Sequence, residues 1–265
     1  MPMKHFTVRE TWLHRVNPSF KLAVCLVLFA IVLFTDRINF LVNLTWVSLL
    51  MFLFATGFPA NMLLMFLLPV LLLLVSSSTS MMFFGKGETT WLQWGLLHIT
   101  KESFFRGLHI GFKSVNFALL GYVLTLTTKP VLLIYSLMQQ CRLPAKYAYS
   151  FMAAVRLAPL VAEEFQTLRR ALAVRGVEEQ RGIRGFFAKL KAYSVPLLAQ
   201  SIRRAQRMAV AMEAKRFSRS SARTYYYHVG FSLPDVWFAL LWAVAIAAAH
   251  WAGTQYPYFD IMDVR

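Results

Sequence analysis

Long runs of apolar residues, each closed by a short polar or turn segment, dominate the pattern of this sequence. A helix needs about 20 such residues to cross the hydrocarbon core of a bilayer. The pattern predicts five membrane-spanning helices, at about residues 20–35, 38–56, 60–84, 108–128 and 236–251. Pro69 is expected to kink the third helix. Residues 85–101 carry fewer apolar positions and are expected to form a loop.

The composition agrees with a membrane protein. Of the 265 residues 58% are hydrophobic and 15% are charged, whereas soluble domains are about 45–50% apolar and about 25% charged. This excess of apolar residues excludes an intrinsically disordered chain. Two cysteines exclude a secreted disulfide scaffold of this length. The sequence therefore predicts an all-α membrane protein.

The charge is concentrated in one segment. The net charge is +16, from 28 basic and 12 acidic residues, and residues 142–223 alone hold 17 basic and five acidic ones. Beside several membrane spans, such a block indicates a cytoplasmic face, because Lys and Arg accumulate there. No nucleic-acid partner is therefore expected. The N-terminus and the basic block are expected in the cytoplasm, joined by four spans, and the fifth span leaves a short tail outside.

Three regions follow from this arrangement. Residues 1–128 are expected to form the N-terminal membrane part, residues 129–231 to form cytoplasmic helices, and residues 232–265 to contain the last span and the outer tail. An integral protein of this kind has the lipid bilayer as its first partner.

The basic block has helical periodicity, and it predicts two amphipathic helices. The first is expected to begin at Pro159, because proline is favoured in the first turn of a helix. Its apolar stripe recurs in steps of three and four residues at Val161, Phe165, Leu168 and Leu172. The second is expected to open at Pro196, with its stripe at Leu198, Ile202, Ala205, Ala209 and Met212. A glycine-rich connection containing Gly182 and Gly185 is expected between them.

Each stripe ends at a cation. The next helical step after the first stripe falls on Arg175, and after the second on Arg216, which follows Lys215. A partner with an apolar groove that ends in carboxylates or carbonyls would accept both features. Alternatively, the two stripes pack on each other or lie on the lipid surface.

Three stretches of the chain resemble the transmembrane T component of energy-coupling factor transporters, which are modular importers of vitamins and transition-metal ions. The first stretch, residues 15–21, is similar to the family's Asp-Pro-Arg-Thr-Lys entry to its first span, with Asn17 in place of Asp. The second and third are residues 156–176 and 195–217, which end in segments similar to the family's two Ala-Arg-Gly signatures. Together the three stretches extend over most of the chain.

The resemblance implies a coupling and scaffold subunit in the plasma membrane of a prokaryote. Its long cytoplasmic coupling helices would dock on two ATP-binding-cassette ATPases, and its membrane part would hold a substrate-binding S component. The signatures fall on Val174, Arg175, Gly176, Ala214, Lys215 and Arg216. The alignment with the family favours Lys215 as the second anchor, and the stripe favours Arg216. The S component selects the substrate in this family, so vitamins, cobalt and nickel remain open.

Residue patterns for catalysis are absent from the sequence. It contains no P-loop, no His-Glu-x-x-His and no Cys-x-x-Cys, and its six histidines are dispersed. We therefore expect no catalytic residues, no metal site and no cofactor, and thus a protein that is not an enzyme. The alternative is a self-contained secondary transporter or channel with a basic cytoplasmic domain. It would need an internal repeat or polar residues converging in mid-membrane, and the sequence has neither.

Overall fold

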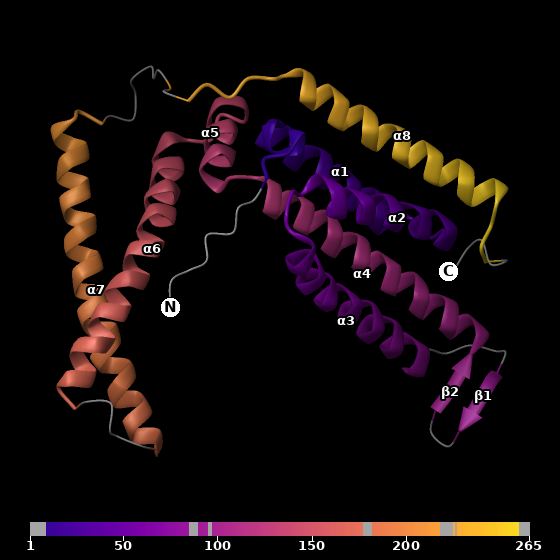
Figure 1. Ribbon diagram of the computed structural model, residues 1–265, viewed down its shortest axis with the longest axis horizontal. Helices are drawn as coiled ribbons and strands as arrows, with labels where there is room; N and C mark the ends of the chain where they lie inside the picture. Colours follow the sequence, from indigo (N-terminus) through magenta and orange to yellow (C-terminus); the bar gives the residue numbers. More distant parts are fainter. Residues whose placement is uncertain are drawn as a thin grey trace. The chain divides into compact units, whose positions relative to one another are not determined.

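The computed structural model describes residues 9–84, 90–94, 97–176, 182–217, 225 and 227–259 (Figure 1). Its elements, in chain order, are η1 (Trp12–Arg15), α1 (Pro18–Phe34), α2 (Ile38–Ala55), α3 (Ala60–Phe84), β1 (Thr90–Trp94), β2 (Leu97–Thr100), α4 (Lys101–Thr127), α5 (Pro130–Gln140), α6 (Ala145–Val174), α7 (Gly182–Ala214) and α8 (Leu233–Gln255). The expected all-α membrane class is confirmed. Strands β1 and β2 pair antiparallel within the segment expected to be a loop, so that expectation was wrong there.

The chain divides into two compact units. One contains Met1–Leu133 together with Val229–Arg265, and the other contains Ile134–His228. The first unit, here called the membrane unit, holds the apolar helices. The second, here called the basic unit, holds α6 and α7.

The membrane unit contains the helices with the length and composition of membrane spans. In the described part of the chain these are α2, α3, α4 and α8, and α1 is an apolar helix one residue shorter than the shortest of them. Helix α1 begins at Pro18, behind Asn17, whose side chain accepts a hydrogen bond from the backbone N–H of Ser19. These helices make the chain a multi-pass membrane protein.

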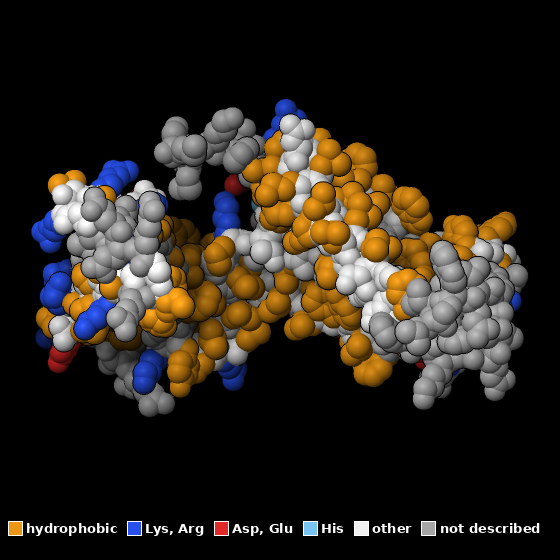
Figure 2. Space-filling view, turned by 90° about the horizontal axis from the view of Figure 1, so that it is seen from below, with side chains coloured by type: hydrophobic (Ala, Val, Ile, Leu, Met, Phe, Trp, Pro, Cys, Tyr) orange, Lys and Arg blue, Asp and Glu red, His pale blue; other side chains and the backbone are white. Residues whose placement is uncertain are grey.

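Helix α4 packs against α1, α2 and α3. It begins at Lys101, seven residues before the predicted start, because Thr100 caps it by accepting a hydrogen bond from the Ser103 N–H. In mid-helix, Asn116 donates to Thr45 Oγ1 of α2 over 2.7 Å. Apolar side chains cover much of the outside of this unit, as Figure 2 shows.

Small residues bring α3 and α4 into close contact. A Cβ placed on Gly107 would lie 2.6 Å from the carbonyl oxygen of Ser78, and one on Gly111 would overlap the Ser78 hydroxyl. Ser78 is buried, whereas Ser76 and Ser80 on the same helix are exposed. Glycine is therefore required at both positions of α4 for this packing.

In the basic unit both expected helix starts were wrong. Pro159 lies inside α6 and Pro196 lies inside α7, so each helix begins more than ten residues earlier than predicted. Proline removes one backbone hydrogen bond but does not end a helix that is held on both sides of it. Gly182 and Gly185 belong to α7 instead of the expected connection. Residues 177–181, which join the two helices, lie outside the described residues.

Candidate functional site

Helices α6 and α7 cross each other, and polar side chains from both helices form hydrogen bonds and an ion pair between them (Figure 1). Glu164 of α6 accepts a hydrogen bond from Gln200 Nε2 over 2.9 Å and forms an ion pair with Arg204. Nearby, the rings of Phe165 and Tyr193 lie 5.3 Å apart between centroids. The face of α7 that meets α6 is therefore partly polar.

Most of the apolar stripe of α7 is left uncovered by α6. Leu198 is 62% exposed and Ile202 is 57% exposed, while Ala205 and Ala209 are also exposed. Met212, the last residue of the stripe, is half-buried, and so are residues on another face of α7, which includes Gln200. The interpretation that the two stripes pack on each other is therefore wrong for Leu198, Ile202, Ala205 and Ala209.

The stripe of α6 is partly covered. Val161, Leu168 and Leu172 are half-buried, and Phe165 is 40% exposed. Lys and Arg side chains lie among the apolar ones on this part of the molecule, as Figure 2 shows. The two helices thus present apolar surface and cations together, which is typical of a surface that receives a partner.

Helix α6 ends in a left-handed turn at its signature. Arg175 is the C-cap residue, with its N–H bonded to the carbonyl of Ala171, and Gly176 follows with a φ of 73°. The N–H of Gly176 donates to the carbonyl of Ala173 over 3.1 Å. Glycine favours this position because it has no Cβ to clash in the left-handed conformation.

Helix α7 ends in the same way, although it lacks the glycine. Lys215 is the residue after the last helical position, and Arg216 follows with a φ of 51°. The backbone N–H of Arg216 donates to the carbonyl of Glu213 over 2.8 Å, and the backbone N–H of Phe217 donates to the carbonyl of Met212 over 3.0 Å. These two bonds form a Schellman motif. Lys215 therefore occupies the position that Arg175 has in α6, and Arg216 occupies that of Gly176.

All six residues of the two signatures are exposed: Val174, Arg175, Gly176, Ala214, Lys215 and Arg216. Val174 is 90% exposed although it is apolar. Among the described residues no acidic side chain forms an ion pair with Arg175, Lys215 or Arg216. The two helix tips therefore offer cations and apolar surface to solvent or to a partner.

A buried polar junction in the membrane unit was not identified as a site from the sequence. Lys21 is 0% exposed, and its Nζ donates to the carbonyl of Leu13 over 2.7 Å and to Thr127 Oγ1 over 3.1 Å. Asp235, 2% exposed, accepts the Asn17 N–H over 2.6 Å. The stretch that resembles the family's entry motif thus joins the start of α1 to the end of α4 and the start of α8. The sequence feature that could have revealed this junction is Asp235, a single acidic residue at the start of an otherwise apolar span.

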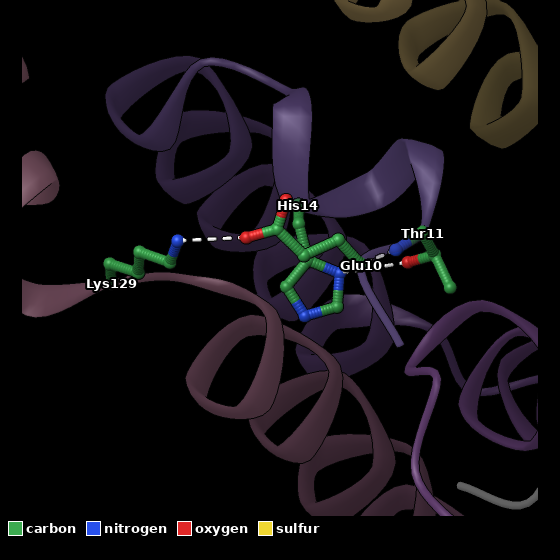
Figure 3. A network of polar contacts seen from close by, with 4 residues as sticks. All are labelled: Glu10, Thr11, His14 and Lys129. Carbon is green, nitrogen blue, oxygen red and sulfur yellow. Dashed lines mark hydrogen bonds and ion pairs between the residues drawn. The ribbon is translucent and has the colours of Figure 1, made fainter. Parts of the chain in front are cut away.

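A second polar network lies at the same end of the unit (Figure 3). Lys129 forms an exposed ion pair with Glu10 over 3.0 Å, and this cation holds the pKa of the Glu10 carboxyl below its usual value. The Thr11 N–H donates to Nδ1 of His14 over 3.2 Å. Burial, and then the charge of Lys21, lower the pKa of His14. The Thr11 hydroxyl donates to the carbonyl of Ala55 in α2 over 2.6 Å, and this bond ties η1 to a membrane helix.

No group of three or more metal-ligating side chains occurs within the part of the chain that the structure describes. The histidines at His109 and His250 lie in different surroundings, since His109 is buried with Nε2 3.1 Å from the carbonyl of Thr35, and His250 is exposed.

Comparison with known proteins agrees with these features. A family model, CbiQ, described as a cobalt transport protein, matches residues 9–226. The chain is 29% identical over 244 residues to the energy-coupling factor transporter transmembrane protein EcfT of Limosilactobacillus fermentum, covering 87% of this chain and 89% of the relative. It is 28% identical over 244 residues to EcfT of Thermotoga maritima, with 88% and 87% covered. For EcfT of Listeria innocua the identity is 27% over 253 residues, with 91% and 94% covered.

Proposed function

The chain belongs to the CbiQ family, and from this premise we propose that it is the coupling subunit of an ATP-driven importer. It is the transmembrane component of an energy-coupling factor transporter, as its EcfT relatives are named. In this proposal it transmits the motion of two ATP-binding-cassette ATPases to a membrane-embedded S component. It carries out no chemical reaction itself, and the ATPases hydrolyse the nucleotide.

The observation that carries the proposal is the repeated geometry of the two helix ends. Arg175 and Lys215 occupy the same position after the last residue of α6 and α7, each beside an apolar stripe. An exposed apolar stripe on α7, with Leu198 and Ile202 largely uncovered, supports docking into an apolar groove. The terminal cation would fix the register of each helix by binding carboxylates or carbonyls of its ATPase.

Rigid helices suit this task. The pair of Glu164 and Arg204 joins α6 to α7 about two thirds of the way along each helix. A motion applied at either tip is then carried along the helix as a rigid body. The membrane helices would receive this motion and pass it to the S component.

The orientation follows the charge. The basic unit and the N-terminus lie in the cytoplasm, where the ATPases are, because Lys and Arg near the ends of membrane spans are retained on that side. The chain is a multi-pass protein of the plasma membrane of a prokaryote in this proposal. The imported solute is a vitamin or a transition-metal ion, selected by the S component.

Exchange of the tip residues tests the proposal. Arg175→Ala and Lys215→Ala should each lower ATP-driven uptake and the amount of ATPase that co-purifies, while membrane insertion stays normal. Losing one partner of a buried charged contact costs about 2–5 kcal/mol of binding. Arg170→Ala is the matched control, because Arg170 is an exposed cation of α6 five residues before the tip. Unchanged uptake and co-purification in both tip variants, or uptake by the chain without any ATPase, would contradict the proposal.

A further inference from the structure

A cavity of about 470 Å³ lies at the end of the membrane unit opposite the Lys21 junction. It is bounded by the end of α1, the turn between α1 and α2, and the last turns of α8. Its polar rim consists of Asp36, Arg37 and His250, and its walls include Ile31, Phe34 and Ile246. Its volume falls in the range of about 300–1,000 Å³ that small-molecule sites occupy.

The position of the cavity relates it to the surface of the bilayer. Helix α1 has 17 residues, so its end lies about 25 Å along the helix from its start. Asp36 and Arg37 separate two consecutive apolar helices, which places them where the hydrocarbon meets water. The charged rim therefore faces the headgroup layer and the apolar walls face the hydrocarbon.

The rim is held in place by polar contacts. Lys113 Nζ donates to the carbonyl of Leu33 over 2.9 Å, and His109 Nε2 lies 3.1 Å from the carbonyl of Thr35 and donates to it. Cations near the C-terminus of a helix stabilise its last carbonyls in this way. Lys113 also interacts electrostatically with Asp36. Among the described residues no acidic side chain forms an ion pair with Arg37, so its guanidinium can attract an anion.

The wall formed by α8 is fixed as well. Asn39 of α2 donates from Nδ2 to the carbonyl of Phe259 and accepts the Phe259 N–H at Oδ1, each over 3.1 Å. Gly253 lets α8 approach α2, since a Cβ there would lie 3.3 Å from the backbone nitrogen of Phe40. The cavity is therefore bounded by elements whose relative positions are defined within one compact unit.

We propose that this cavity binds an anionic phospholipid, with the phosphate on Arg37 and His250 and the upper part of an acyl chain between Phe34 and Ile246. The guanidinium of arginine donates two parallel hydrogen bonds to phosphate oxygens. The apolar walls require a ligand that carries hydrocarbon next to its anion, which a phospholipid does. All residues that line this cavity belong to the membrane unit, and the proposal stands independently of the coupling function.

The test measures lipid bound to the full-length chain. The protein is purified in a mild detergent, phosphatidylglycerol is added, and bound lipid is counted by native mass spectrometry. We expect each chain to bind one phosphatidylglycerol at a saturable site. Arg37→Gln should bind it about tenfold more weakly, because a charge-assisted contact to the phosphate is lost. Ile246→Trp fills the apolar part and should abolish binding. Lys101→Gln removes an exposed cation outside the cavity and should bind as the unchanged protein does.

Two further ligands test whether the cavity recognises the net charge of the lipid and its acyl chain. Phosphatidylcholine should bind more weakly than phosphatidylglycerol, because its choline cancels the charge of its phosphate. Glycerol phosphate, which has no acyl chain, should fail to displace the lipid. Equal binding by Arg37→Gln and the unchanged protein, equal binding of the two lipids, or displacement by glycerol phosphate would overturn the proposal. Arg37 is exposed, so its substitution leaves the fold intact and keeps the test valid if Ile246→Trp fails to fold.

Discussion

Asp235 accepts the backbone N–H of Asn17 over 2.6 Å, across 218 positions of the sequence. The other oxygen of the same carboxylate accepts the backbone N–H of Ser232 over 2.7 Å, at the start of α8. One buried acid therefore caps the last span and ties it to the first. Because the two partners come from opposite ends of the chain, this carboxylate closes the membrane unit.

Asp235→Asn should destabilise the membrane unit. The amide has one acceptor oxygen and one NH₂ group, so one of the two N–H donors loses its partner while buried. Such a loss costs about 1–3 kcal/mol. The measurement is the unfolding midpoint of the detergent-solubilised chain. Glu213→Gln, an exposed acid of α7, is the control and should unfold as the unchanged protein does. Equal midpoints for Asp235→Asn and the control would contradict the prediction.

The membrane helices could be predicted from sequence because an apolar run needs no tertiary information. Their exact starts could not, since they depend on caps such as Thr100 and on neighbours such as Gly107, whose role appears only when α3 lies beside α4. Pro159 and Pro196 misled the prediction of α6 and α7 for a physical reason. A proline is favoured in the first turn of a helix and costs stability in its interior, but the interior position is tolerated where residues on both sides hold the helix.

The candidate site was predictable in part. The apolar steps that end at Arg175 are a local property of the sequence, and so is the glycine after it. The correspondence of Lys215 with Arg175 needed the backbone, because the left-handed residue at Arg216 is not a glycine. The junction of Lys21 with Thr127 joins residues 106 positions apart, and no local pattern reveals such a contact.

His14 should make the free energy of unfolding of the membrane unit fall as the pH drops below neutrality. Burial, and then the charge of Lys21, lower the pKa of His14 below 6.5. The unfolded chain then binds a proton more readily than the folded one. The contribution is therefore complete above pH 6.5 and is lost as the pH falls through the lower folded pKa.

Unfolding midpoints of the unchanged protein and His14→Asn between pH 7.5 and 5.5 check this expectation. Asparagine has no proton to gain in this range, and its Oδ1 can still accept the Thr11 N–H. The midpoint of His14→Asn should therefore depend less on pH. Parallel curves for the two proteins would show that His14 does not contribute. Glu10 titrates at lower pH, since its pKa lies below 4.5, so it does not disturb the comparison.

The ends of α6 and α7 should respond in opposite directions to exchange of their left-handed residues. Gly176→Ala places a Cβ at a φ of 73°, and Arg216→Gly removes one at a φ of 51°. No atom lies within 4 Å of a Cβ added at Gly176, so the effect there comes from the backbone alone. Each change is worth about 1 kcal/mol, destabilising the end of α6 and stabilising the end of α7. Amide hydrogen exchange at the two helix ends measures both effects.

The variant Arg216→Gly also separates the two candidates for the second anchor, Lys215 and Arg216. If Lys215 binds the ATPase, Arg216→Gly keeps the anchor and stabilises the turn that presents it, so ATP-driven uptake should be retained or increased. If Arg216 is the anchor, uptake should fall about as far as in Arg175→Ala, although the helix end becomes more stable. In both cases Arg216→Gly should slow amide exchange at the end of α7. Uptake should be retained or increased if Lys215 is the anchor, and it should fall if Arg216 is the anchor. We expect the first, because Lys215 and Arg175 occupy equivalent positions in the two helix ends.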